Sequence, residues 1–294
     1  MNGTVSGEAP LIFMHIPKCG GMSLYSALAE ELGVNYVADL YDVSRHQMKN
    51  TAQLAHDKSM KAYCGHFSFG LHNWINRPSY YFSMVRRPEK RLESLYFFLA
   101  GMWPPLHKGI VSSGFSFFRH RMPEFHWDYF DYFFAKKPDP EIFFSASSLE
   151  LDNGIVRRFS GYGLNPSPCP PEALQKAKEN AAKHFSFIGV TEHYEESLVR
   201  MSKIFGFQKF REKKANVNKL KLIKKQELPT SIIKKIAKMN PYDIDFYDWV
   251  LQRFEDKSIE TRATGLFSMG RRDFTEIPFW KAVGGGREKA IKSG

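Results

Sequence analysis

Short apolar runs alternate with helical patterns of apolar residues along most of this chain. Continuous apolar runs at residues 11–16, 80–85 and 187–190 predict buried strands, because a strand covered on both faces has no polar side. Strands that alternate with helices predict an α/β fold, P-loop-like, with three α/β/α layers around a central, mainly parallel sheet. Apolar residues that recur every three or four positions predict helices at 23–32, from Pro88 to Leu99, at 191–204 with Thr191 as N-cap, at 229–238 and at 241–254.

Two segments depart from this alternation. Residues 101–145 are crowded with Phe, Tyr, Trp and His and are interrupted by Pro and Gly, which predicts an irregular or helical insertion. Residues 255–294 end in the sequence VGGGREKAIKSG, which predicts a loosely ordered tail. We therefore expect one α/β domain over residues 1–254, with the aromatic insertion inside it and the tail after it.

The first strand is followed by residues suited to binding an anion. Lys18 precedes Gly20 and Gly21, and Ser23 opens the next helix. Glycines let the backbone N–H groups at a helix N-terminus approach an anion closely, and the helix dipole favours negative charge there. A nucleotide-kinase loop, GxxxxGK[ST], has its Lys after the second Gly, so this order argues against a Walker-type NTPase. An ordinary strand-to-helix turn with a surface Lys is the alternative.

A second candidate anion site follows the strand at 80–85. Arg86 leaves the end of this strand, Pro88 begins the next helix, and Ser94 lies about two turns along it. An Arg at the carboxyl edge of a parallel sheet lies where open α/β sheets bind ligands, and it can hold a phosphate through two hydrogen bonds. Two such sites predict a ligand with two separated phosphate-like groups. The alternative is an Arg-rich helix start that only caps the helix.

Composition and charge narrow the class of protein. With 294 residues, 43% of them hydrophobic, the chain is expected to be globular, and we expect neither a membrane span nor a signal peptide. The net charge is +11, and residues 203–238 hold twelve Lys or Arg against two Glu, a balance of +10. This basic segment predicts either a polyanionic partner or a solvated helix face and loop. Three cysteines predict reduced thiols and a cytoplasmic location, with a lumenal enzyme trimmed of its anchor as the less favoured alternative.

Six segments, in order over residues 11–250, resemble the sulfotransferases that use 3′-phosphoadenosine 5′-phosphosulfate (PAPS). HIPKCGGMSL is similar to their 5′-phosphosulfate loop, usually HIPKTGGTSL, and VRRPEKRLESLYFF is similar to their 3′-phosphate motif, VRDPxERxxSxYxF. GHFSFG resembles a segment of the glycan 2-O-sulfotransferase branch, and the later blocks are DNGIVRRFSG, FSFIGVTEHYEESL and NPYDIDFYDWV. The chain departs from the pattern where Cys19 and Met22 replace two Thr and where Arg87 replaces an acidic residue.

The resemblance implies a role for each matching residue. It places the 3′-phosphate on Arg86 and Ser94, assigns His66 as the catalytic base, and implies that Asn218 and Lys219 close over the nucleotide. The reaction it implies needs no metal and leaves adenosine 3′,5′-bisphosphate (PAP) as product. It places the 5′-phosphosulfate on the first loop, where the lysine would also stabilise the transferred sulfuryl group; the loop residues are Lys18, Cys19, Gly20, Gly21, Met22, Ser23 and Leu24.

Other histidines and the acceptor are less closely defined. His72 is the second candidate for the base, and His15 is expected to be structural. The implied acceptor bears a hydroxyl, and the branch resemblance and the basic segment at 203–238 favour a glycan. The aromatic residues of 101–145 could stack on sugars, but they could equally bind a lipid, a polyketide or a small alcohol. Two other functions remain open at this point: a nucleotide kinase of related fold, and a nucleic-acid-binding module that uses the basic segment.

Overall fold

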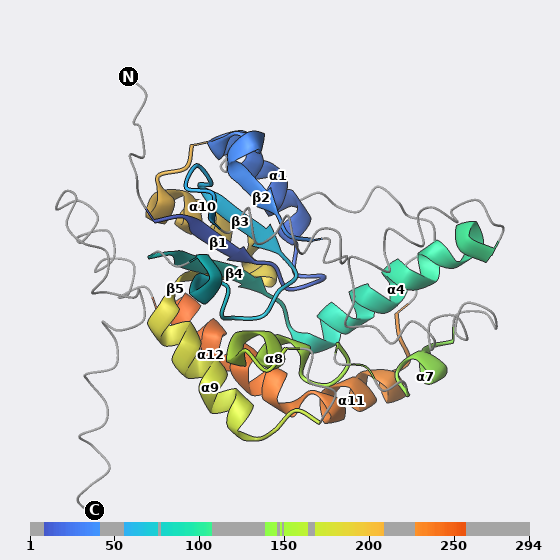
Figure 1. Cartoon of the computed structure of the whole chain (residues 1–294). Coiled ribbons are helices and arrows are strands. Elements are labelled where there is room, and N and C mark those ends of the chain that lie inside the picture. The colour runs from blue at the N-terminus through green and yellow to red at the C-terminus, as the bar shows by residue number, and fades with distance from the viewer. Residues whose placement is uncertain are drawn as a thin grey trace, which may run out of the picture.

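The fold is built on a parallel sheet of five short strands (Figure 1). The computed structural model describes residues 9–41, 56–75, 78–107, 139–145, 148, 150–163, 168–208 and 227–256, with the backbone alone for 101–107. The strand order is β2-β3-β1-β4-β5, and every neighbouring pair is parallel. The strands are β1 (Leu11–Met14), β2 (Val37–Asp39), β3 (Ala62–Gly65), β4 (Tyr80–Val85) and β5 (Phe185–Val190).

Helices cover both faces of this sheet, which explains why its strands are apolar throughout. Figure 1 shows helices packed on each side of the strands. The predicted three-layer α/β fold is therefore confirmed. On the first face lie α1 (Gly21–Leu32) and α10 (Tyr194–Phe205), and on the second lie α8 (Gly154–Ser160), α9 (Glu172–His184) and α12 (Pro241–Glu255).

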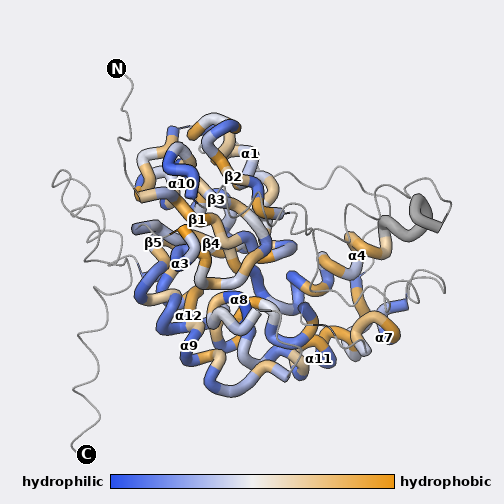
Figure 2. The backbone as a smooth tube through the Cα atoms, viewed as in Figure 1, coloured by the Kyte–Doolittle hydropathy of each residue, from blue (hydrophilic) through white to orange (hydrophobic). Residues whose placement is uncertain are grey.

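A second, smaller apolar cluster lies beside the sheet. Figure 2 shows hydrophobic residues gathered where three helices meet, which are α4 (Pro88–His107), α7 (Pro140–Phe143) and α11 (Thr230–Met239). The buried residues of this cluster include Leu92, Leu95, Phe143, Ile232 and Ile236. None of the helices in the described part of the chain is long and apolar enough to span a membrane. The short elements are η1 (Val34–Tyr36), α3 (His72–Ile75) and η2 (Thr191–His193).

The structure describes only parts of the predicted insertion and tail. Helix α4 continues into the segment 101–145, and α7 lies near the end of that segment, so both described parts of the segment contain helix. Residues 108–138 and 257–294 lie outside the described residues. The division into one domain and a tail therefore stays a prediction.

Two helices on the second face cap each other. The side-chain carbonyl of Asn153, just before α8, accepts hydrogen bonds from the backbone N–H groups of Tyr242 (2.9 Å) and Asp243 (3.1 Å) in α12. The Asp243 carboxylate in turn accepts hydrogen bonds from the N–H groups of Ile155 (3.0 Å) and Val156 (2.8 Å) in α8. Each helix thus satisfies N–H groups that the other helix leaves without intrahelical partners. The sequence blocks DNGIVRRFSG and NPYDIDFYDWV therefore have a structural role.

A buried ion network connects this pair of helices to α4. Arg91 in α4 is fully buried, and its guanidinium lies 2.6 Å from Glu150 and 3.7 Å from Asp243. Arg158 in α8 also pairs with Glu150, so two cations face two carboxylates. Burial alone would raise the pKa of Glu150, but Arg158 and Arg91 lower it to about 2. The network fixes the helix that carries the second predicted anion site against the second face of the sheet.

Candidate active site

The two predicted anion sites lie side by side at the carboxyl edge of the sheet. Strands β1 and β4 are neighbours, in the register that pairs Leu11 with Tyr80 and Met14 with Ser83. Because the two strands are parallel, the loop after β1 and Arg86 after β4 leave the sheet at the same edge. Open α/β sheets bind ligands at this edge, at the point where the connections that leave two neighbouring strands run in opposite directions. Here that point lies between β1, whose connection leads to β2, and β4, whose connection leads to β5 on the other side.

The loop after β1 adopts a backbone that presents a helix N-terminus. Lys18 has φ 68° and Gly20 has φ 80°, both left-handed, and α1 begins at Gly21. No side chain caps this helix start, so its first N–H groups are available to an anion. A left-handed Lys is uncommon, and such strain concentrates at functional sites. The loop geometry therefore fits an anion, as the sequence predicts.

Close packing beneath this loop requires a glycine. A Cβ atom built on Gly21 would lie 2.1 Å from Cδ2 of His15, far closer than any real contact. His15 follows β1 and is buried, which agrees with the expectation that it is structural. Burial, His66, Lys18 and Arg158 hold the pKa of His15 well below its usual value, so its ring is neutral. The loop thus rests directly on a neutral imidazole.

Lys18 and Arg86 lie next to each other, although 68 positions separate them in the sequence. The Arg86 guanidinium donates a 3.4 Å hydrogen bond to the Lys18 carbonyl oxygen. The Lys18 ammonium lies 3.9 Å from the centre of the Phe98 ring in α4. Burial and the nearby Arg86 lower the pKa of Lys18 to about 8. Two cations held this close favour binding of an anion with high charge density.

The Thr191 side chain contacts the backbone of both predicted anion sites. The sequence predicts this residue as a helix N-cap. That prediction is wrong, because η2 precedes α10 and no side chain caps either helix. The Thr191 hydroxyl instead lies 3.0 Å from the Cys19 carbonyl oxygen and 2.9 Å from the Val85 carbonyl oxygen. Since a hydroxyl has one proton, it donates to these two carbonyls as alternatives or shares the proton between them. It fixes the end of β4 against the loop after β1, the predicted phosphate loop (Lys18 to Leu24).

His66 lies in an aromatic cluster at the ends of three strands. It follows β3, His15 follows β1, and Tyr41 lies just after β2. The His66 ring centre is 4.6 Å from that of His15 and 4.9 Å from that of Tyr41. Nδ1 of His15 lies 2.8 Å from the Tyr41 hydroxyl, which fixes the orientation of its ring. The predicted base therefore lies at the same edge of the sheet as the phosphate loop.

His72, the second candidate for the base, lies elsewhere. Its Nδ1 is 3.0 Å from the hydroxyl of Tyr81, the second residue of β4, and its ring stacks on His184 at 5.3 Å. His184 immediately precedes β5, so these residues lie at the amino ends of the strands. Burial lowers the pKa of His72. This position is at the opposite edge from Lys18 and Arg86.

The positions that depart from the family pattern have distinct environments. Cys19 is buried, its Sγ lies 3.8 Å from the Pro17 carbonyl oxygen, and burial raises its pKa to about 12, so it is a neutral thiol. Met22 is 56% exposed on the first turn of α1. Arg87 lies 3.5 Å from Asp248 and faces the ring of Tyr247, both in α12. These contacts direct Arg87 away from Lys18 and towards the second face of the sheet.

Three further residues of the predicted site lie on α1 and α4. Ser94 is half-buried on α4, and Ser23 is half-buried in the first turn of α1, while Leu24 is buried in the main core. Asn218 and Lys219 lie outside the described residues. In the part of the chain that the structure describes, no group of three His, Cys, Asp or Glu residues could hold a metal ion.

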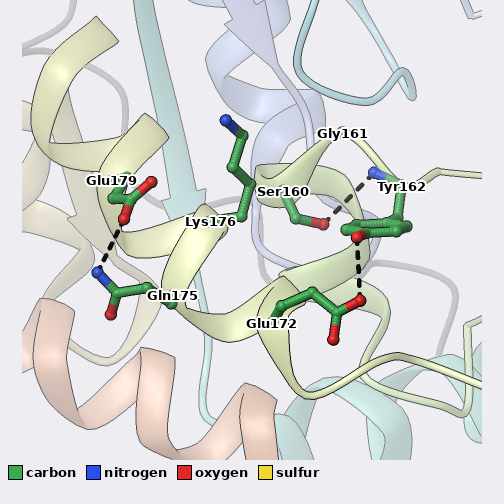
Figure 3. Close-up of a pocket in the computed structure, with 7 residues that line it drawn as sticks. All are labelled: Ser160, Gly161, Tyr162, Glu172, Gln175, Lys176 and Glu179. Atoms are coloured by element: carbon green, nitrogen blue, oxygen red, sulfur yellow. Dashed lines mark hydrogen bonds between the residues drawn. The ribbon is translucent and has the colours of Figure 1, made fainter.

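An open pocket on the second face differs from this site in both position and chemistry. Figure 3 shows it between the end of α8 and α9, and its volume is about 510 Å³. Four of its polar side chains form two pairs: Tyr162 donates to Glu172 at 3.4 Å, and Gln175 donates to Glu179 at 3.0 Å. None of the predicted site residues lines it. We therefore assign the candidate active site to the carboxyl edge of β1, β3 and β4.

Three residues of this site escape the sequence-based prediction. Tyr41, Phe98 and Thr191 all make side-chain contacts there. Tyr41 and Thr191 come from segments without a recognised phosphate-binding pattern, whereas Phe98 ends the segment VRRPEKRLESLYFF but was given no role of its own there. A signal was present for Phe98, because it lies four residues after Ser94 and so shares a helix face with it. No comparable spacing relates Tyr41 or Thr191 to the loop.

Comparison with known proteins agrees with this geometry. A model of the sulfotransferase family matches residues 2–250, which is most of the chain and includes both anion sites and His66. A comparison with curated proteins found no significant match. A match over this length identifies an enzyme that transfers sulfuryl groups, and on this basis the chain belongs to the sulfotransferase family.

Proposed function

We propose that this enzyme transfers the sulfuryl group of PAPS to a hydroxyl of a carbohydrate. One observation carries the donor assignment: a helix N-terminus with Lys18 and a strand end with Arg86 lie side by side at one sheet edge. PAPS carries a 5′-phosphosulfate and a 3′-phosphate on one nucleoside, so it needs two anion sites that are close but separate. Family membership and the Lys-before-Gly order both favour this donor over the nucleoside triphosphate of a kinase.

In this proposal the loop and Lys18 hold the phosphosulfate, and Arg86 and Ser94 hold the 3′-phosphate. The N–H groups at the start of α1 donate to the 5′-phosphate, whose charge increases as the bond from sulfur to its bridging oxygen breaks. Lys18 stabilises the charge on that oxygen and on the sulfuryl oxygens. Asn218 and Lys219 are proposed, from the family resemblance alone, to close over the nucleotide.

His66 is the proposed base. It takes the proton of the acceptor hydroxyl as the acceptor oxygen forms its bond to sulfur, in line with the departing 5′-phosphate. Its position beside His15, which touches Gly21 of the phosphate loop, supports this role. Replacement of His66 by Ala should lower kcat about 10²–10⁴-fold, the usual range for a positioned base. PAP affinity should change less than threefold, and a kcat within a few-fold of the parent would exclude His66.

The proposed acceptor class rests on two features of the sequence. A carbohydrate is supported by the resemblance of GHFSFG to the glycan 2-O-sulfotransferase branch and by the basic segment at 203–238. The proposed location is the cytoplasm, which three buried, unpaired cysteines support. A screen of acidic glycans, neutral glycans and small alcohols with labelled PAPS would identify the acceptor. Transfer to small alcohols alone would refute the carbohydrate assignment.

The donor assignment is tested by calorimetry with two nucleotides. PAP should bind far more tightly than adenosine 5′-phosphate, because only PAP occupies both anion sites. Replacement of Arg86 by Ala should weaken PAP by about 2 kcal/mol, the scale for a lost charge-assisted hydrogen bond, and should leave adenosine 5′-phosphate unchanged. Arg87→Ala is the matched control, since Arg87 faces Asp248 instead of the loop. Equal affinities for the two nucleotides would refute the assignment of Arg86 and Ser94.

A further inference from the structure

One face of α4 turns towards the phosphate loop. Ser94 and Phe98 are four residues apart, so they lie one above the other on this face. The Phe98 ring lies 3.9 Å from the Lys18 ammonium, within the range of a strong cation–π contact. Lys18 belongs to the loop after β1, whereas Phe98 belongs to the helix after β4. This contact therefore joins the side chains of the two donor motifs.

The surroundings of Lys18 disfavour the charged form of its side chain. Its backbone is left-handed, its side chain is largely buried, and Arg86 is the cation that acts on it most strongly. Of the other ionisable groups nearby, the Cys19 thiol is neutral, and His15 is neutral as well. The contact with the Phe98 ring is thus a favourable interaction for a buried ammonium next to a guanidinium.

We propose that Phe98 is a positioning residue that holds the Lys18 ammonium at the donor site with its ring face. The proposal rests on the function proposed above, in which Lys18 contacts the phosphosulfate. A carboxylate in place of the ring would hold the lysine more strongly, but it would also cancel the positive charge and repel an anionic donor. An aromatic face attracts an ammonium through its quadrupole and carries no net charge. It therefore orients the lysine without weakening the anion site.

Replacement of Phe98 by Leu removes the ring and keeps an apolar side chain. The ammonium of Lys18 then loses its cation–π partner, so the pKa of Lys18 should fall by about half a unit or more. The value of kcat/KM for PAPS should fall about threefold or more near pH 9, well above the Lys18 pKa of about 8. Near pH 6.5 it should stay within twofold of the parent, since the lysine is protonated there in both proteins. Phe98→Tyr keeps the ring and should behave as the parent.

The matched control is Phe97→Leu, on the neighbouring position of α4, whose ring packs against Tyr96. This control should leave the pH dependence unchanged. An equal loss of kcat/KM at both pH values in Phe98→Leu would show a packing role and overturn the proposal. Titration of Lys18 by NMR in the ligand-free protein provides a readout independent of catalysis. If the parent protein does not bind PAP, the donor assignment is refuted. If the pKa of Lys18 is the same in Phe98→Leu as in the parent, the role of Phe98 is refuted.

A measurement on the parent protein covers the case in which Phe98→Leu does not fold. The ε-CH₂ protons of a lysine stacked on a ring face are shifted upfield by the ring current. We expect such a shift for Lys18 in the ligand-free protein, identified by comparison with Lys18→Met. Random-coil positions for these protons would overturn the proposal without any variant of Phe98.

Discussion

Binding of PAP should depend steeply on pH above neutrality because of Lys18. In the ligand-free protein, burial and Arg86 lower the pKa of Lys18 from 10.5 to about 8. A phosphate group bound beside the ammonium favours the charged form and should return the pKa towards its ordinary value. The experiment therefore compares PAP binding at about pH 7 and at about pH 9.5. Over this range Lys18 loses its proton in the free protein and should keep it in the complex.

The sign and the size of the effect follow from this difference. The pKa is higher in the complex than in the free protein, so binding takes up a proton, and affinity is full below about pH 8 and falls above it. A full return from about 8 to 10.5 corresponds to about 3.4 kcal/mol, at about 1.36 kcal/mol per pKa unit, which is an upper limit. At about pH 9.5 the dissociation constant should be up to about 30-fold higher than at about pH 7.

Calorimetry with PAP measures both the affinity and the proton. Titrations near pH 8.5 in two buffers with different ionisation enthalpies should show uptake of a substantial fraction of one proton. The phosphates of PAP have their second pKa near 6 and contribute little in this range. Lys18→Met should bind PAP more weakly, with no pH dependence above neutrality. An affinity that stays within twofold between about pH 7 and about pH 9.5, with no buffer dependence, would refute the placement of Lys18 at the donor site.

Three further substitutions test the scaffold of the site. Gly21→Ala places a Cβ about 2.1 Å from the His15 ring, so PAP affinity should fall about tenfold or more in calorimetry, and unchanged binding would contradict the packing described. Asp243→Asn leaves one N–H group of α8 without its carboxylate acceptor and should lower the free energy of unfolding in urea by about 1–3 kcal/mol; a change below about 0.5 kcal/mol would exclude reciprocal capping. Thr191→Val should cost about 1 kcal/mol of stability and weaken PAP, and wild-type values for both would show that the hydroxyl is dispensable.

The apolar pattern predicts the long buried elements and misses the short ones. The strand at 80–85 is found as predicted, and β1 ends at Met14, two residues earlier than predicted. Strands β2 and β3 have three and four residues, too few to show a period, so they were not predicted. Helix α9 was also missed; its sequence EALQKAKENAAKH favours a helix through intrinsic propensity, and its apolar residues are mainly alanines.

The chemistry of the site is predictable where one short segment contains it. The Lys, Gly and Ser of the first loop and Arg86 follow from local order, because each group directly follows a strand. Contacts between distant segments do not follow in this way. The contacts of Lys18 with Phe98 and of His66 with His15 depend on which strands become neighbours in the sheet. Arg91 shows the same limit: it resembles a solvated helix residue in the sequence, yet it is fully buried between two carboxylates.

The reciprocal capping of α8 and α12 has a consequence for the synthesis of this protein on the ribosome. Both donor motifs and His66 are complete once residue 98 has been made, but the carboxylate that faces Arg91 and caps α8 belongs to residue 243. Until α12 leaves the exit tunnel, the nascent chain has a buried arginine with only part of its counter-charge and a helix start without acceptors. The site at the sheet edge is therefore expected to reach its final form late, after all of the chain to which the sulfotransferase family model aligns has been translated.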